Sequence, residues 1–150
     1  MMKLSMGLPT REEELDILNR YMNKEPMDEL EKTFSLDELL EAKKAAELVY
    51  VHPCICEYMV DIIGGTRKSD NILMGVSPRG SLALMRCVKA YAYLHGRDYC
   101  IPDDVKAVAV PVLAHRLVLG YGMDSSGDNA SHIMETIIEN TPVPTEDFTK

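Results

Sequence analysis

The centre of the chain, residues 77–96, reads SPRGSLALMRCVKAYAYLHG. A serine followed by a proline suits the start of an α-helix, and the closing glycine suits its end. Between them, residues 82–94 are apolar on nearly every side, and only Arg86 and Lys89 interrupt the pattern. A helix of this kind is typical of the buried centre of a bundle. We therefore expect the remaining elements to pack around it.

Helix-start signals and apolar stripes place further helices on both sides of this segment. Two capping boxes, Thr10 with Glu13 and Ser35 with Glu38, predict helices over residues 11–22 and from residue 36 to about residue 48. The stripes expected to face inward are Leu15, Leu18 and Met22 in the first helix and Leu36, Leu39, Leu40, Lys43 and Ala46 in the second.

Prolines and glycines mark the limits of the other helices. Pro53 suits the first turn of a third helix, which Gly64 and Gly65 are expected to end or fray. Residues 68–76 are predicted to be a loop. Pro102 opens a later helix that Pro111 should kink or split, and residues 130–140 can form a short last helix.

Strand signals are weak and isolated along the chain. Residues 2–9 alternate in polarity and break at Pro9, which is typical of the exit of a strand into a turn. The predicted fold class is therefore all-α: a bundle of about five helices with short connections and at most a short N-terminal strand remnant.

Charge and composition restrict the classes of function. The formal net charge of −8 over 150 residues disfavours binding to nucleic-acid backbones or anionic membranes. No apolar run approaches the roughly 20 residues of a membrane-spanning helix, and residues 1–9 do not resemble a signal peptide. We therefore expect a cytoplasmic protein without membrane insertion.

The four cysteines, Cys54, Cys56, Cys87 and Cys100, lack the spacing of a metal or redox motif. Cys54 and Cys56 are two residues apart in a predicted helix and cannot easily share an ion. Buried free thiols are favoured over zinc or redox chemistry, and no metal site is predicted. The four histidines are scattered, and spacing groups none of them with a cysteine or serine nucleophile.

Motifs of self-contained enzymes are absent from the sequence. It has no phosphate loop of the Gly-x-x-x-x-Gly-Lys-Ser/Thr type, no Gly-x-Ser-x-Gly and no His-Glu-x-x-His. The chain by itself is not expected to bind a nucleotide through a phosphate loop or to hydrolyse it.

The residues Ser77-Pro78-Arg79 form the most pointed candidate site. The start of a helix attracts anions, and a guanidinium held in its first turn adds a bidentate phosphate ligand. Cationic side chains are more usual at the C-terminal end of a helix. Arg79 at a helix start is therefore a local misfit, and misfits of this kind tend to mark function. Taken alone, this short and common tripeptide is more typical of a routine cap with an exposed arginine.

Several stretches together resemble the helical lid of MoxR-type AAA+ ATPases. They are residues 75–86, GVSPRGSLALMR; residues 89–99, KAYAYLHGRDY; residues 102–106, PDDVK; and residues 111–117, PVLAHRL; Thr66-Arg67 precedes them. The resemblance implies a junction from an AAA+ core over residues 1–9, a lid over residues 10–144 and a tail over residues 145–150.

The resemblance also implies a function. Arg79 would be the second sensor arginine, and Ser77, Pro78 and Arg79 would face ATP held with Mg²⁺ by the core. The parent protein would be a chaperone-like ATPase, a hexamer that remodels partners, among them proteins with von Willebrand A domains. Three departures stand out: Leu8 replaces a frequent aromatic residue, Gly80 is more flexible than the usual alanine, and Ile101 replaces a capping Ser or Thr.

Other interpretations remain open on the sequence. A stand-alone helical interaction adaptor is the main alternative, and the isolated strand signal before Thr10 argues against it. A small DNA-binding domain conflicts with the acidic charge. Arg67 could contact a nucleotide or anchor a loop, whereas Asp103 and Asp104 are favoured as helix-start acids over metal ligands.

Overall fold

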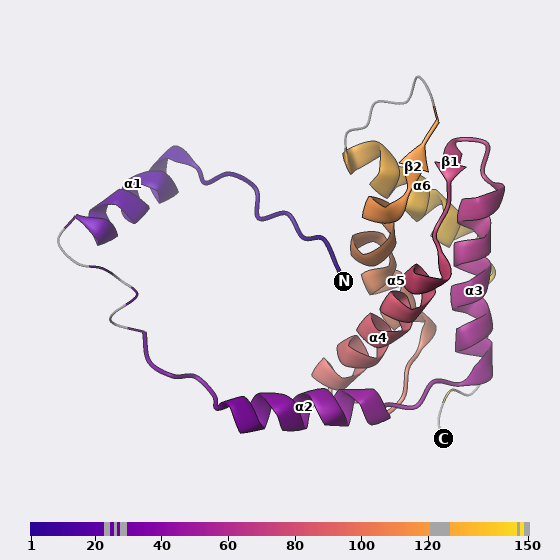
Figure 1. Ribbon diagram of the computed structural model, residues 1–150, viewed down its shortest axis with the longest axis horizontal. Helices are drawn as coiled ribbons and strands as arrows, with labels where there is room; N and C mark the ends of the chain where they lie inside the picture. The colour runs from indigo at the N-terminus through magenta and orange to yellow at the C-terminus, as the bar shows by residue number, and fades with distance from the viewer. Residues whose placement is uncertain (23–24, 26, 28–29, 121–126, 147, 149–150) are drawn as a thin grey trace. The chain divides into compact units, whose positions relative to one another are not determined.

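The computed structural model describes residues 1–22, 25, 27, 30–120, 127–146 and 148 (Figure 1). Residues 4–41 form one compact unit, and residues 1–3 together with residues 42–150 form a second. Each unit is considered by itself below. The division predicted at residues 9 and 144 stays a prediction.

The smaller unit holds helix α1 (Arg11–Tyr21) and the beginning of α2 (Leu36–Leu48). Both predicted capping boxes are confirmed. The Thr10 amide donates to Glu13 Oε2 at 2.8 Å, and Ser35 Oγ accepts from the Glu38 amide at 3.2 Å. Bonds to the backbone amides of Thr10 and Ser35 lower the pKa of the Glu13 and Glu38 carboxyl groups.

The predicted inward stripes of these two helices do not meet a core. No described side chain of α1 or α2 is buried, and Leu18 is 61% exposed. Helical periodicity shows which side chains share a face, but burial also requires a second surface packed against that face.

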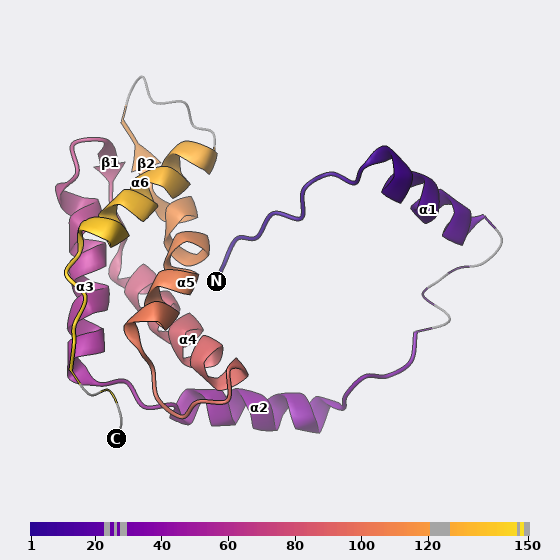
Figure 2. The same ribbon diagram turned by 180° about the vertical axis from the view of Figure 1, so that it is seen from behind.

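The larger unit is a helical bundle (Figures 1 and 2). Its α-helices are α3 (Pro53–Lys68), α4 (Pro78–Leu94), α5 (Pro102–Leu113) and α6 (Gly127–Asn140), with the 3-10 turn η2 (Ala114–Arg116). Helix α5 packs against α3, α4 and α6, and α3 also contacts α4 and α6. The fully buried side chains include Ile55, Ile62, Leu84, Val88, Val105, Val112, Leu113 and Met134. The predicted all-α class is confirmed.

The expectation that residues 82–94 are buried on nearly every side was wrong. Leu84 and Val88 of α4 are fully buried, but Leu82 is 53% exposed and Leu94 is 79% exposed. The buried residues of α4 in the described part of the chain lie along one side of the helix: Gly80, Ala83, Leu84, Val88 and Ala92. The apolar character of a segment does not determine how many neighbours it has. Helix α5 is the more enclosed element.

Helix α3 continues through Gly64 and Gly65 to Lys68, so the predicted end at the glycines was also wrong. A Cβ placed on Gly65 would lie 2.7 Å from Ile137 Cγ2 of α6. The glycine therefore permits close helix packing here. Pro111 lies inside α5, which ends two residues later and passes into the tighter turn η2.

The strands lie in segments that carry no strand signal in the sequence. Residues 1–9 contain no strand, whereas the predicted loop 68–76 contains β1 (Ile72–Met74). This short strand pairs antiparallel with β2 (Val118–Leu119). A strand needs a hydrogen-bonding partner, and the two chain segments become partners only in the folded bundle.

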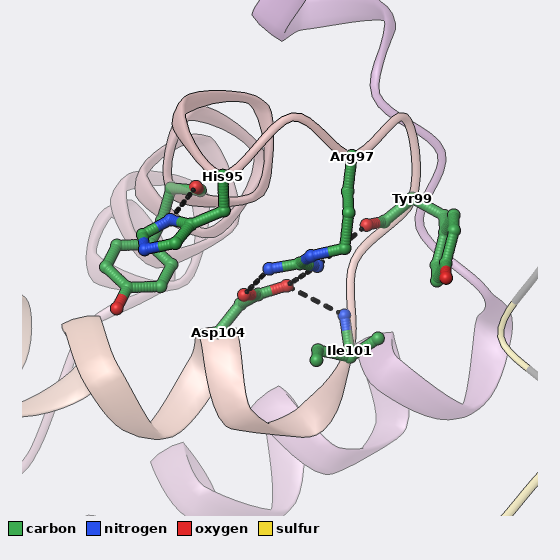
Figure 3. A network of polar contacts seen from close by, with 6 residues as sticks. His95, Arg97, Tyr99, Ile101 and Asp104 are labelled. Carbon is green, nitrogen blue, oxygen red and sulfur yellow. Dashed lines mark hydrogen bonds and ion pairs between the residues drawn. The ribbon is translucent and has the colours of Figure 1, made fainter.

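An ion pair fastens the connection between α4 and α5 (Figure 3). Asp104 is buried, and both of its carboxylate oxygens accept from the Arg97 guanidinium. The same carboxylate accepts from the Ile101 amide at 2.9 Å, and Arg97 Nη1 donates to the Tyr99 carbonyl at 3.1 Å. Asp104 thus secures the start of α5, where the N-cap residue Ile101 has no side-chain group that could cap the helix. The prediction that Asp104 is a helix-start acid is confirmed.

Replacing Asp104 with Ala is expected to lower the free energy of unfolding by about 3 kcal/mol, because Arg97 and the Ile101 amide lose their acceptor inside the fold. Asp103→Ala is the matched control. Asp103 is exposed and forms a surface ion pair with Lys106, so its loss should cost less than about 1 kcal/mol. Urea unfolding of both variants measures the difference, and equal losses would contradict this account.

Candidate functional site

The segment before α4 is fixed by two side chains at the end of α3. The buried hydroxyl of Thr66 accepts the Val76 amide at 3.1 Å and donates to the Ile63 carbonyl at 2.6 Å. Arg67 Nε donates to the Val76 carbonyl at 3.0 Å. Both backbone polar groups of Val76 are therefore held by α3. Of the two interpretations of Arg67, the structure shows loop anchoring. Arg67 anchors the loop through the backbone carbonyl of Val76 and not through an acidic side chain.

Two glycines let the backbone approach closely at this point. A Cβ on Gly75 would lie 2.7 Å from the Thr66 carbonyl oxygen. A Cβ on Gly80 would overlap Val76 Cγ1 and lie 3.4 Å from Arg116 Cδ. Gly80 is buried and helical, so its role here is to leave space for Val76, and the expected flexibility is not what the structure shows.

Arg116 supports the first turn of α4 from the opposite side. Its Nε donates to the Val112 carbonyl at 2.8 Å, and its Nη2 donates to the Met1 carbonyl at 3.0 Å. The aliphatic part of its side chain lies beside Gly80. Arg116 therefore has a structural role, because its guanidinium bonds to backbone carbonyls and its stem covers Gly80.

Ser77, Pro78 and Arg79 are all exposed at the beginning of α4. Ser77 has the extended conformation of an N-cap residue, but its hydroxyl makes no capping bond; its carbonyl accepts from the Gly80 amide at 2.7 Å. The position of the predicted cap is confirmed, while side-chain capping is not observed.

Arg79 differs from the two other arginines beside the start of α4. Arg67 and Arg116 each donate to a backbone carbonyl. Within the part of the chain that the structure describes, no hydrogen bond or ion pair engages the Arg79 guanidinium. A rigidly placed, exposed guanidinium beside the first turn of a helix is suited to binding an anion such as phosphate.

Thr66 is the residue whose role the sequence did not reveal. It continues the spacing of the buried stripe Ile55, Met59, Ile62 and Ile63, and the hydroxyl at a core position is the signal that could have found it. A buried hydroxyl must satisfy its hydrogen bonds inside the fold, so it indicates a specific partner.

The cysteines are free, as expected, and differ in burial. Cys54 and Cys100 are buried, while Cys56 and Cys87 are half-buried. Burial, with a smaller effect of Asp104, raises the pKa of the Cys100 thiol to about 11. Spacing did not group a histidine with a cysteine, but the fold does: His52 Nδ1 lies 2.8 Å from Cys54 Sγ.

Comparison with known proteins identifies the class. Residues 64–137 match the sequence profile of the AAA lid domain family. This range contains α4, α5 and the hydrogen bonds from Thr66 and Arg67 to the Val76 backbone. A crystal structure of a candidate ATPase from Cytophaga hutchinsonii superposes with a TM-score of 0.81 at 27% identity, over 97% of this chain and 47% of that one. The bundle is therefore an AAA lid.

Two curated relatives narrow the family. YeaC of Bacillus subtilis is 37% identical over 146 residues, and Chaperone MoxR1 of Mycobacterium tuberculosis is 30% identical over 153 residues. The chain carries the lid domain of a MoxR-type AAA+ ATPase. The matches cover 97% and 96% of this chain but 46% and 40% of the relatives, so the chain spans less than half of their length.

No helix in the described ranges combines the length and apolar character needed to cross a membrane.

Thr66→Val should destabilise the larger unit by about 1–3 kcal/mol, because the buried Val76 amide loses its acceptor while the side-chain volume is kept. Amide hydrogen exchange at Val76 should accelerate beyond the change in global stability. Thr136→Val is the control, since the exposed Thr136 hydroxyl donates only within α6, to the His132 carbonyl. If the amide of Val76 exchanged its hydrogen no faster in Thr66→Val, the Thr66 hydroxyl would not be what holds Val76 in place.

Gly80→Ala should lower the free energy of unfolding by about 1–3 kcal/mol, although alanine favours helices, because the methyl group overlaps the stiff Val76 side chain. Gly64→Ala is the matched control inside α3. Nothing lies within 4 Å of a Cβ there, so this variant should gain about 0.5–1 kcal/mol. Thermal unfolding shows whether each variant is more or less stable than the unchanged protein. Stabilisation by both changes would show that Gly80 is not sterically required.

Proposed function

We propose that this lid contributes Arg79 to ATP binding and hydrolysis as the second sensor arginine of a MoxR-type ATPase. The observation that carries the proposal is a contrast at the start of α4: the neighbouring Arg67 and Arg116 donate to backbone carbonyls, whereas Arg79 is exposed and has no partner among the described residues. Ser77 and Pro78 form the nucleotide-facing start of α4 with it.

The chemistry of this arrangement suits phosphoryl transfer. A guanidinium presents paired donors to phosphate oxygens and stabilises the negative charge that develops on them. The sequence of this chain has no phosphate loop, so an AAA+ core supplies that loop and holds ATP with Mg²⁺. The lid adds one charge from outside the core.

The anchoring of α4 provides a means of coupling. The start of α4 is bound to the end of α3 through Val76, so a force on Arg79 acts on the bundle and not on a loose loop. Nucleotide state would then set the position of the lid, which is the usual logic of hinged domain motion.

The remainder of the proposal concerns the whole ATPase. It acts in the cytoplasm as a hexamer whose neighbouring subunits supply an arginine finger, and it remodels partner proteins, including those with von Willebrand A domains. The name of the relative Chaperone MoxR1 supports the chaperone-like role. Nucleic acid is not a partner, in keeping with the net charge of −8.

Arg79→Ala in the full-length ATPase is expected to reduce kcat for ATP hydrolysis by at least about 100-fold, because the charge on the transferring phosphate loses a ligand. Arg86→Ala is the control: it removes an exposed arginine from the same helix two turns later and should leave turnover unchanged. The isolated chain should show no ATP hydrolysis. Normal turnover in the Arg79→Ala protein would reject the sensor assignment.

A further inference from the structure

The C-terminal segment returns to the beginning of α3. After α6 ends at Asn140, the chain runs beside α3 toward its N-terminus (Figure 2). Phe148 is partly buried against the core and fastens this segment. Glu146, two residues earlier, is thereby placed near the first turn of α3.

Three different ligand types meet at this place. The ligand atoms of His52, Cys54 and Glu146 all lie within 4.8 Å of one another. His52 Nδ1 is 2.8 Å from Cys54 Sγ and 3.8 Å from Glu146 Oε2. Both the thiol and the carboxylate face the same ring nitrogen. A catalytic relay needs its acid on the other nitrogen of the ring, so this arrangement is not a nucleophilic triad.

We propose that His52, Cys54 and Glu146 form a binding site for a divalent transition-metal ion of the zinc type. Imidazole nitrogen, thiolate sulfur and carboxylate oxygen are the donors that Zn²⁺ takes in proteins, and three protein ligands leave a fourth position for water. Calcium and magnesium, which prefer all-oxygen sites, do not fit this donor set.

The distances in the site are close to those of coordination, and an ion at His52 Nδ1 would replace the bond that this nitrogen accepts from the Cys54 amide at 3.3 Å. Tetrahedral coordination at zinc bond lengths places ligand atoms about 3.3–3.6 Å apart. The carboxylate is already near this distance from Nδ1, and the sulfur must move away from Nδ1 by less than about 1 Å. His52 is only partly exposed and Cys54 is buried, so two of the three ligands are held by the fold. Glu146 is exposed and completes the site from the tail.

The Glu146 carboxylate adds a negative charge beside His52 and Cys54, which favours a cation at this place. A bound dication stabilises the thiolate, so binding releases the Cys54 proton to solvent and leaves the oxidation states unchanged.

Metal binding at this site would fasten the tail to α3. Two ligands come from residues 52–54 and the third from beyond α6, so one ion connects segments more than 90 residues apart (146 minus 54 is 92). The role is structural and is independent of Arg79.

Titration of the reduced chain with Co²⁺ tests the proposal, since Co²⁺ reports its ligands by absorption. One equivalent should produce a sulfur-to-cobalt charge-transfer band and tetrahedral d–d bands, and Zn²⁺ should displace it. Calorimetry with Zn²⁺ should give a 1:1 complex with proton release, and Zn²⁺ should raise the unfolding temperature. Absence of saturable binding of either ion would overturn the proposal.

Variants assign the ligands. Cys54→Ser should abolish the charge-transfer band, and His52→Ala and Glu146→Gln should each weaken Zn²⁺ binding at least tenfold, on the order seen for conserved metal-site partners. Cys56→Ser and Glu57→Gln, on the same helix, are controls that should keep both band and affinity. Glu146→Gln alters an exposed side chain, so it keeps the test valid if Cys54→Ser fails to fold. A band that survives Cys54→Ser, or is lost in Cys56→Ser, would assign the metal elsewhere.

Discussion

Two side chains at the end of α3 bind both backbone polar groups of Val76, and the position of α4 depends on this contact. A segment leading into a helix normally lies at the surface, where water satisfies its backbone. Here the Val76 side chain is buried, so its amide and carbonyl need partners inside the protein. Thr66 and Arg67 provide them, and the chain then enters α4 in a fixed direction. Gly80 must be small because Val76 occupies the space beside it.

The charged groups of the bundle divide into two sets. Asp104 is buried with its carboxylate bound by Arg97, and a buried charge of this kind is tolerated only when it is paired and hydrogen-bonded. Arg67 and Arg116 donate to carbonyls near the start of α4. These groups shape the fold. Arg79 is exposed, has no partner in the described ranges, and stands on the element that the others hold in place, which is why its charge is available to a ligand.

Helix α3 connects the two sites proposed for this lid. Its last turn carries Thr66 and Arg67, and its first turn carries Cys54, with His52 as the N-cap residue. The sixteen residues of α3 span roughly 24 Å from one end of the helix to the other. The sensor proposal depends on an AAA+ core, whereas the metal site uses only residues of this chain. Gly65 allows α3 to pack closely on α6, and the segment after α6 then brings Glu146 back to the start of α3.

The sequence by itself determined the helical class, the capping boxes at Thr10 and Ser35, and the place of Ser77-Pro78-Arg79 at a helix start, because caps and periodicity depend on residues within a few positions of one another. The similarity of residues 75–117 to MoxR-type lids was also present in the sequence. The tertiary structure alone decided that α4 is covered on one side, that α3 runs through two glycines, and that residues 72–74 pair with residues 118–119. It also brought Thr66 to Val76 and Glu146 to Cys54. These pairings join distant positions of the chain, and local propensity contains no information about which surfaces meet.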